Sequence, residues 1–285
     1  MNKTTLIPCA ALLLAFFLWQ QAWPDQTDKA LPTFKKVMIV VLENEDYHDA
    51  MGQPYMSKLA REGANLTHFF AETHPSLPNY IALTSGSLHG FDSNSTNIID
   101  VSHVGDLLEA KGMTWKVYAE GFPGNCFTEA KKGNYVRKHL PFLSYRNVVN
   151  NPVRCNKIVE ASQLQIDIAA GDLPNYALFI PDLRNSGHDT SVRHADQWLA
   201  QTFDPLLQNP QFMKDMLLIV TFDEGSRLRD NHIYTVLYGD SVKAGSVSSV
   251  AYNHYSLLRT IENAFGLGTL GRNDADAAPI TEIWK

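Results

Sequence analysis

The stretch KVMIVVLEN, residues 36–44, decides the fold class. From Val37 to Leu42 every residue is apolar, with no alternation between apolar and polar positions. Such a run predicts a strand buried on both faces, as in a sheet that helices cover on both sides. Glu43 and Asn44 then end the run abruptly. Because open α/β sheets bind ligands beyond the carboxyl ends of their strands, we expect these two side chains to border a site.

Three further apolar runs have the character of strands, and they lie at residues 176–180, 216–222 and 233–238. Helical signals separate the runs, at residues 55–62, 104–111, 161–170, 192–201 and 257–265. Strands that alternate with helices are typical of parallel sheets. The sequence therefore predicts an α/β fold, a three-layer sandwich with a central, mostly parallel sheet flanked by helices, in a single domain over residues 34–285.

A second stretch, FAETHPSLPNYIALTSG at residues 70–86, places Ser76 in an expected turn between Pro75 and Pro78. Both prolines lack an N–H donor and fix φ, so this loop should be stiff. A hydroxyl on a rigid turn between a strand and a helix suits a nucleophile that meets an anionic substrate. The alternative is that Ser76 only caps the helix that follows.

Composition excludes some classes of function. Of the 285 residues, 45% are hydrophobic and 19% are charged, as is ordinary for a globular protein. The formal net charge is −6, and no basic block or stripe interrupts the chain. We therefore expect no nucleic-acid partner.

The first 22 residues differ from the rest, with Lys3 preceding an apolar run at residues 6–19. A positive start and an apolar run of this length are typical of a signal peptide. An uncleaved N-terminal anchor is the alternative, although the run is marginal for a full membrane span. Both interpretations predict an exported protein, periplasmic or secreted.

Export makes the cysteine count informative. Cys9 lies in the leader, which leaves Cys126 and Cys155, 29 positions apart. An oxidising compartment favours their pairing. A disulfide closing this loop would contribute roughly 3–4 kcal/mol by loop-entropy reasoning. Both cysteines belong to a loop-rich stretch at about residues 121–156, which we expect to be an insertion that covers or lines a site.

Acidic or acid–histidine clusters end three of the predicted strands: Glu43-Asn44, Asp182 to His188-Asp189, and Asp223-Glu224. His232 precedes the fourth strand. Carboxyl ends of parallel strands meet at one edge, and carboxylates gathered there repel unless a cation lies among them. Oxygen donors suit Ca²⁺ or Mg²⁺, and added histidine makes Zn²⁺ or Fe feasible. Any one pair taken singly could equally be a solvated loop or a helix cap.

Five blocks of the sequence occur in one order: VLEN (41–44), HPSLPNY (74–80), PD to HD (181–189), FDEG (222–225) and NH (231–232). This set resembles the motif series of the secreted bacterial acid phosphatase and phospholipase C phosphoesterases, within the alkaline phosphatase superfamily. The similarity runs from about residue 36 to residue 265. The block KHLPF (138–142), flanked by the two cysteines, also resembles the family's middle segment.

The resemblance implies an alkaline phosphatase-like fold and a mechanism. It assigns a metal site, for Ca²⁺, Mg²⁺ or Zn²⁺, to four residues that supply oxygen ligands: Glu43, Asn44, Asp223 and Glu224. Ser76 is implied to be the metal-bound nucleophile, which passes through a phosphoseryl intermediate. His188 and His232 are implied to contact phosphate oxygens or to protonate the leaving group.

Four more residues are expected to bind substrate or to support the residues that do: His74, Asn79, Asp182 and Asp189. His74 either lines the site or braces the turn. The two aspartates are expected to hold His188 in orientation. His254 has no assigned role, and a place in a helix-capping loop is the simpler interpretation.

The leading hypothesis is an exported metal-dependent acid phosphatase that hydrolyses small phosphate monoesters. Serine at position 76, where phospholipase C members carry threonine, and a length that is short for the family favour it. A phospholipase C-type phosphodiesterase is the alternative, for which aromatic residues of the 121–156 segment are the candidate groove. A phospho-ligand binding protein without turnover is a third hypothesis. Membrane contact is expected only through the leader or a lipid substrate.

Overall fold

The computed structural model describes Met1, residues 33–227 and residues 229–285. Apart from Met1, the predicted signal peptide or anchor lies outside these residues. No helix in the described part of the chain is long and apolar enough to cross a membrane.

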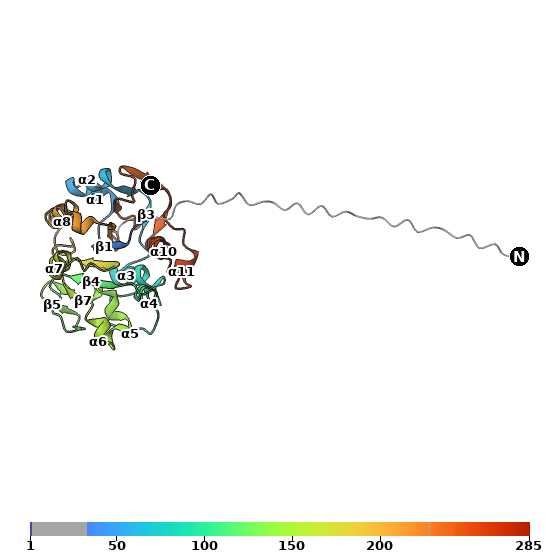
Figure 1. The fold of residues 1–285 in the computed structure, drawn as a ribbon, viewed down its shortest axis with the longest axis horizontal. Coiled ribbons are helices and arrows are strands. Elements are labelled where there is room, and N and C mark those ends of the chain that lie inside the picture. Colours follow the sequence, from blue (N-terminus) through green and yellow to red (C-terminus); the bar gives the residue numbers. More distant parts are fainter. Residues whose placement is uncertain (2–32, 228) are drawn as a thin grey trace.

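An eight-stranded sheet forms the centre of the fold (Figure 1). Its strands, in spatial order, are β11 (Ser246–Ser248), β2 (Ala64–Leu66), β10 (Thr235–Gly239), β9 (Met216–Phe222), β1 (Lys36–Leu42), β8 (Tyr176–Ile180), β4 (Trp115–Ala119) and β7 (Ile158–Glu160). Of these, β10 runs against both of its neighbours, and the remaining pairs are parallel. The predicted mostly parallel sheet is confirmed.

The central strand β1 and its neighbour β9 end at the same edge of the sheet. Leu42 is in register with Phe222 of β9, and the N–H of Asp223 donates to the carbonyl of Leu42 at 3.0 Å. Glu43 and Asp223 therefore leave the sheet side by side. Every residue from Val37 to Leu42 is buried, as the absence of alternation predicts.

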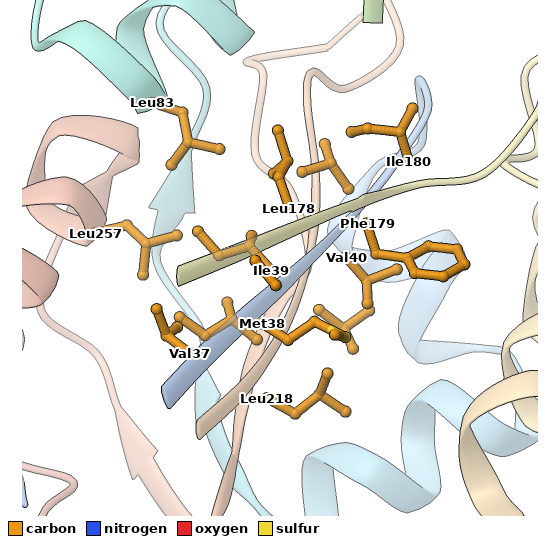
Figure 2. Close-up of a cluster of buried hydrophobic side chains, with 14 of the residues drawn as sticks. Val37, Met38, Ile39, Val40, Leu83, Leu178, Phe179, Ile180, Leu218 and Leu257 are labelled. Carbon is orange, nitrogen blue, oxygen red and sulfur yellow. The ribbon is translucent and has the colours of Figure 1, made fainter. Parts of the chain in front are cut away.

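Helices cover both faces of the sheet. In Figure 2, Leu83 of α3 (Ser76–Ser85) and Leu257 of α10 (His254–Phe265) lie on one side of β1 and β8. Phe179 points the other way, and its ring lies 5.3 Å from that of Phe203 in α8 (Val192–Leu207). This arrangement is the predicted three-layer sandwich.

The remaining elements surround this core. The other α-helices are α1 (Tyr47–Met51), α2 (Pro54–Glu62), α4 (Val104–Ala110), α5 (Arg146–Val149), α6 (Pro152–Cys155), α7 (Gln163–Ala170), α9 (Pro210–Met213) and α11 (Asn273–Asp276). Two small sheets pair β3 (Phe69–Phe70) with β12 (Tyr252–Asn253), and β5 (Lys131–Lys132) with β6 (Tyr135–Val136).

The segment predicted to be loop-rich is held together by a few specific contacts. Cys126 and Cys155 form the expected disulfide, with their Cα atoms 5.4 Å apart. Two 3₁₀ turns, η1 (Arg137–His139) and η2 (Pro141–Ser144), lie between them. The buried guanidinium of Arg137 donates to the carbonyls of Thr128 at 3.0 Å and Leu143 at 2.8 Å. These bonds fix the turn that Arg137 begins.

Candidate active site

Ser76 begins helix α3, and its hydroxyl points at carboxylates. Pro75 occupies the N-cap position, and Pro78 is accommodated because the first turn of a helix has no N–H partners to lose. The Ser76 Oγ lies 3.2 Å from Glu43 Oε2 and 3.2 Å from Glu224 Oε1. The helix starts at Ser76 itself, where a turn was expected, and the Ser76 hydroxyl contacts carboxylates and makes no capping bond.

Three carboxylates from two neighbouring strand ends surround this hydroxyl, and all of them are buried. Burial, together with the charges of Glu43 and Glu224, raises the pKa of Asp223 well above its usual range. Burial also raises the pKa of Glu224, against the opposing effect of His74. Burial acts the same way on Glu43, but His139 and Lys138 outweigh it and lower its pKa. Asp223 is thus the carboxyl of this group that has no basic side chain to offset its burial.

Two buried oxygen atoms in this group have no hydrogen-bond partner among the described residues: Oδ1 of Asn44 and Oδ2 of Asp223 itself. Asn44 has a φ of 58°, a left-handed conformation that asparagine tolerates better than most residues. Its N–H donates to Asp223 Oδ1 at 3.2 Å. Unpartnered oxygens amid carboxylates with raised pKa values fit a hard divalent cation, as the sequence predicts for these residues.

The turn before Ser76 is braced by two of the predicted support residues. Asn79 accepts hydrogen bonds from the N–H groups of Glu72 at 2.9 Å and Thr73 at 3.1 Å, so it holds the loop. His74 places its Nδ1 2.5 Å from Glu224 Oε2. His74 therefore holds a carboxylate of the site, and Asn79 holds the backbone around it.

The 3₁₀ turn η1 brings two residues to the site that sequence reasoning missed. The Nε2 of His139 lies 3.1 Å from Glu43 Oε2, and Lys138 Nζ lies 3.0 Å from His188 Nε2. Tyr80 lies one helical turn after Ser76, and its hydroxyl donates a hydrogen bond to Glu43 Oε1. The KHLPF block was the available signal, but nothing local connects it to strands about a hundred residues away.

His188 lies in the site, and Asp189 orients it. Asp189 Oδ1 is 2.7 Å from His188 Nδ1, so the opposite ring nitrogen faces Lys138. Ligand atoms of Glu43, His139 and His188 lie within 4.8 Å of one another, a grouping that could also hold a metal ion. Asp182 instead accepts from the N–H groups of its own loop, at Arg184 and Asn185, both at 2.9 Å.

His232 lies at the sheet edge where the site was predicted, but its ring is not among the side chains that line the pocket with Ser76. The ring stacks on Tyr47, with centroids 4.6 Å apart, and its Nε2 is 2.8 Å from the carbonyl of Thr67. The preceding Asn231 points inward instead and accepts from the N–H of Gly225 at 2.7 Å. Asn231 has a left-handed φ of 61°, so the backbone turns at this residue and the two neighbouring side chains have different surroundings.

His254 is buried beneath the site. Its ring Nε2 lies 3.2 Å from the carbonyl of Phe222, and its backbone N–H donates to Glu72 Oε1 at 2.9 Å. Asn253 caps helix α10 by accepting from the N–H of Ser256. The helix-capping interpretation therefore describes this loop, with Asn253 as the capping residue.

A pocket of about 260 Å³ opens above these groups. Its lining includes Asn44, Ser76, Lys138, His188, Glu224 and Arg227. Acidic Glu224 and the basic side chains of Lys138, His188 and Arg227 thus line one pocket together with Ser76. An arrangement of this kind can bind a cation and an anion next to a hydroxyl nucleophile.

Comparisons with known proteins identify relatives of the whole fold. A sequence profile described as the Phosphoesterase family matches residues 46–268. A probable acid phosphatase of Kluyveromyces lactis is 38% identical over 258 residues, which cover 86% of this chain and 61% of that protein. An acid phosphatase of Aspergillus fumigatus is 37% identical, over 86% of this chain and 58% of its own. The chain thus spans about three fifths of these fungal relatives.

A bacterial relative matches over more of its length. The phosphatidylinositol-3-phosphatase of Mycobacterium tuberculosis is 34% identical, over 96% of this chain and 91% of that protein. Among solved structures, a Vibrio parahaemolyticus protein of the alkaline phosphatase superfamily superposes with a TM-score of 0.61 at 16% identity. That match covers 86% of this chain and 70% of the other. At this identity the likeness concerns the fold, which agrees with the predicted alkaline phosphatase-like architecture.

Proposed function

Because this chain belongs to the Phosphoesterase family, we propose that it hydrolyses phosphate monoesters through a phosphoserine intermediate on Ser76. The observation that carries the proposal is the Ser76 hydroxyl, fixed at a helix start within 3.2 Å of both Glu43 and Glu224. A pure binding protein would have no use for such a group. The relatives named acid phosphatase support the same reaction class.

The proposal includes a divalent cation held by Glu43, Asn44, Asp223 and Glu224 together with Ser76. The unpartnered Asn44 Oδ1 and Asp223 Oδ2 support it. When bound, a divalent cation supplies positive charge that favours the deprotonated serine and offsets the charge of the phosphoryl group. Oxygen ligands favour Ca²⁺ or Mg²⁺, whereas the nearby His139 and His188 leave Zn²⁺ feasible.

The side chains of this chain divide the chemistry among them. Ser76 Oγ gives its proton to Nε2 of His188, which lines the same pocket, and attacks phosphorus, and the bond between phosphorus and the ester oxygen breaks. His188, held by Asp189, passes that proton to the departing alkoxide. A water molecule then attacks phosphorus of the phosphoserine, which releases phosphate and restores the hydroxyl. We leave His232 out of these steps because its ring contacts Tyr47 and Thr67.

The structure favours small monoesters over membrane lipids as substrates. Four of the five aromatic residues considered for a lipid groove are buried in the core: Phe122, Tyr135, Phe142 and Tyr145. Phe127 is partly buried against the same core. Because these rings pack in the core, they do not form the lipid groove that the phospholipase C alternative requires. The pocket of about 260 Å³ has room for a phosphoryl group with a modest leaving group.

We further propose that residues 34–285 act as one phosphoesterase domain in an exported protein. One core cluster extends from Phe34 to Trp284, which supports a single domain. The Cys126–Cys155 disulfide supports export, because disulfides persist mainly in oxidising compartments. The signal-like leader agrees with it.

The test is hydrolysis of an aryl phosphate monoester and of the matching diester by the purified protein. We expect monoester cleavage that is lost in Ser76→Ala and after chelation, and that returns when a divalent cation is added back. Ser57→Ala, a matched change at a half-buried serine of α2 whose hydroxyl accepts a hydrogen bond from Arg61, should leave the rate unchanged. Full activity of Ser76→Ala would refute the proposed nucleophile, and preference for the diester would favour the phosphodiesterase alternative.

A further inference from the structure

Lys138 is a cation that has no anionic partner of its own. Its Nζ lies 3.0 Å from His188 Nε2, and the side chain lines the same pocket as Ser76. No carboxylate in the described part of the chain lies within 4.0 Å of its ammonium group. An ammonium group has three donors and no acceptor, so one bond to an imidazole leaves two donors for a ligand.

The neighbouring histidine cannot balance this charge. Asp189 Oδ1 lies 2.7 Å from His188 Nδ1 and therefore leaves the opposite ring nitrogen for Lys138. Nε2 is then the acceptor for Lys138, and both groups face the pocket. The two remaining N–H donors of Lys138 can therefore bind an acceptor that enters the pocket.

The position of Lys138 is fixed from both sides along the chain. Arg137 is buried and bonded to two carbonyl groups, and His139 is buried against Glu43. A lysine between two anchored residues loses less conformational freedom on binding than a lysine on a mobile surface loop. The turn therefore places an ammonium group in the pocket that Ser76 and Glu224 also line, in advance of the substrate.

We infer that Lys138 binds the non-bridging oxygens of the phosphoryl group and selects doubly charged monoesters over singly charged diesters. The inference rests on the proposed function and adds the residue that sets its substrate class. The carboxylates with their cation and the ammonium group of Lys138 then both contact the phosphoryl group in this pocket. A monoester dianion offers this ammonium more charge than a diester, whose second ester group removes one charged oxygen.

The experiment compares Lys138→Met and Lys138→Arg with wild type on the aryl monoester and diester, and measures inhibition by inorganic phosphate. Lys131→Met is the control, because Lys131 lies in the same segment and is exposed. Loss of a charged hydrogen bond predicts a roughly 10- to 100-fold fall in monoester kcat/KM for Lys138→Met. The inhibition constant for phosphate should rise by a similar factor, and diester kcat/KM should fall far less. Lys138→Arg should retain more monoester activity than Lys138→Met.

The outcomes separate the inference from the proposed function. If wild type hydrolyses the monoester but Lys138→Met keeps its kcat/KM and its phosphate inhibition, the inference is wrong and the reaction stands. Equal losses on monoester and diester, with unchanged phosphate inhibition, would likewise contradict a charge-selecting role. If Lys138→Met folds poorly, as judged by circular dichroism, Lys138→Gln and Lys138→Arg provide the same comparison. Absence of wild-type turnover would instead refute the proposed function.

Discussion

Glu262 in helix α10 gives a stability prediction whose sign follows from its surroundings. The residue is fully buried, and Asp274 lies beside it. Burial, and then the charge of Asp274, raises the pKa of Glu262 from 4.5 to about 8. The folded protein therefore keeps this carboxyl protonated at pH values where the unfolded chain has released the proton.

The consequence for stability follows from proton linkage. Below pH 4.5 both states hold the proton, and the favourable contribution is fully present. As the pH rises from 4.5 towards 8, the unfolded chain binds fewer protons than the folded one, and the free energy of unfolding falls. One pKa unit corresponds to about 1.4 kcal/mol, so the whole window corresponds to at most about 5 kcal/mol. Greater stability in mild acid would suit an acid phosphatase.

The perturbation is Glu262→Gln, which keeps the shape and removes the titration. Urea unfolding should be measured for both proteins at pH 5 and at pH 8, with the disulfide intact. We expect the variant to gain stability relative to wild type between the two values, on the order of several kcal/mol. Other groups titrate equally in both proteins and cancel in the difference. A difference in stability between the two proteins that is the same at both pH values would refute the reasoning.

Three other predictions concern the site and its support. His139→Gln should lower the rate of monoester hydrolysis by roughly 10- to 100-fold, because Glu43 loses a residue that positions it; an unchanged kcat/KM would show that the contact is not needed. The double change Cys126→Ser and Cys155→Ser should lower the free energy of unfolding by roughly 3 kcal/mol through the loop of 29 positions, measured by urea denaturation against wild type; equal midpoints would contradict it. Chelation should lower the Tm, since the carboxylates around Ser76 then repel one another without a cation, and a Tm indifferent to added Ca²⁺, Mg²⁺ and Zn²⁺ would count against the metal site.

Much of the fold could be predicted because the sequences of its central strands are almost uninterrupted apolar runs. The runs at 37–42, 176–180 and 216–222 are almost entirely apolar and lie in β1, β8 and β9. The helix at Ser76 was expected to begin later, since two prolines usually interrupt a helix. Proline in a first turn costs little, and the contacts of the Ser76 hydroxyl with distant carboxylates decide the local structure. Those contacts bridge positions 33 and 148 residues apart.

The site was predictable where strand ends converge and not where loops return to it. Glu43 and Asp223 meet because β1 and β9 are neighbours in register, which the topology of a parallel sheet implies. Lys138 and His139 reach the same place from a turn whose path depends on Arg137 and on the packing of the surrounding segment. His232 follows Asn231, whose left-handed backbone breaks the extended path, and its ring stacks on Tyr47, which the local sequence does not reveal.

The central claim is that Ser76 carries the phosphoryl group during turnover. The most direct measurement is mass spectrometry of the protein quenched in acid during hydrolysis of the aryl monoester, followed by peptide mapping. We predict a phosphorylated peptide with the modification on Ser76, absent from Ser76→Ala and from enzyme treated with chelator. Rapid turnover with no phosphoserine at this position in any quench interval, or phosphate on another residue, would contradict the account.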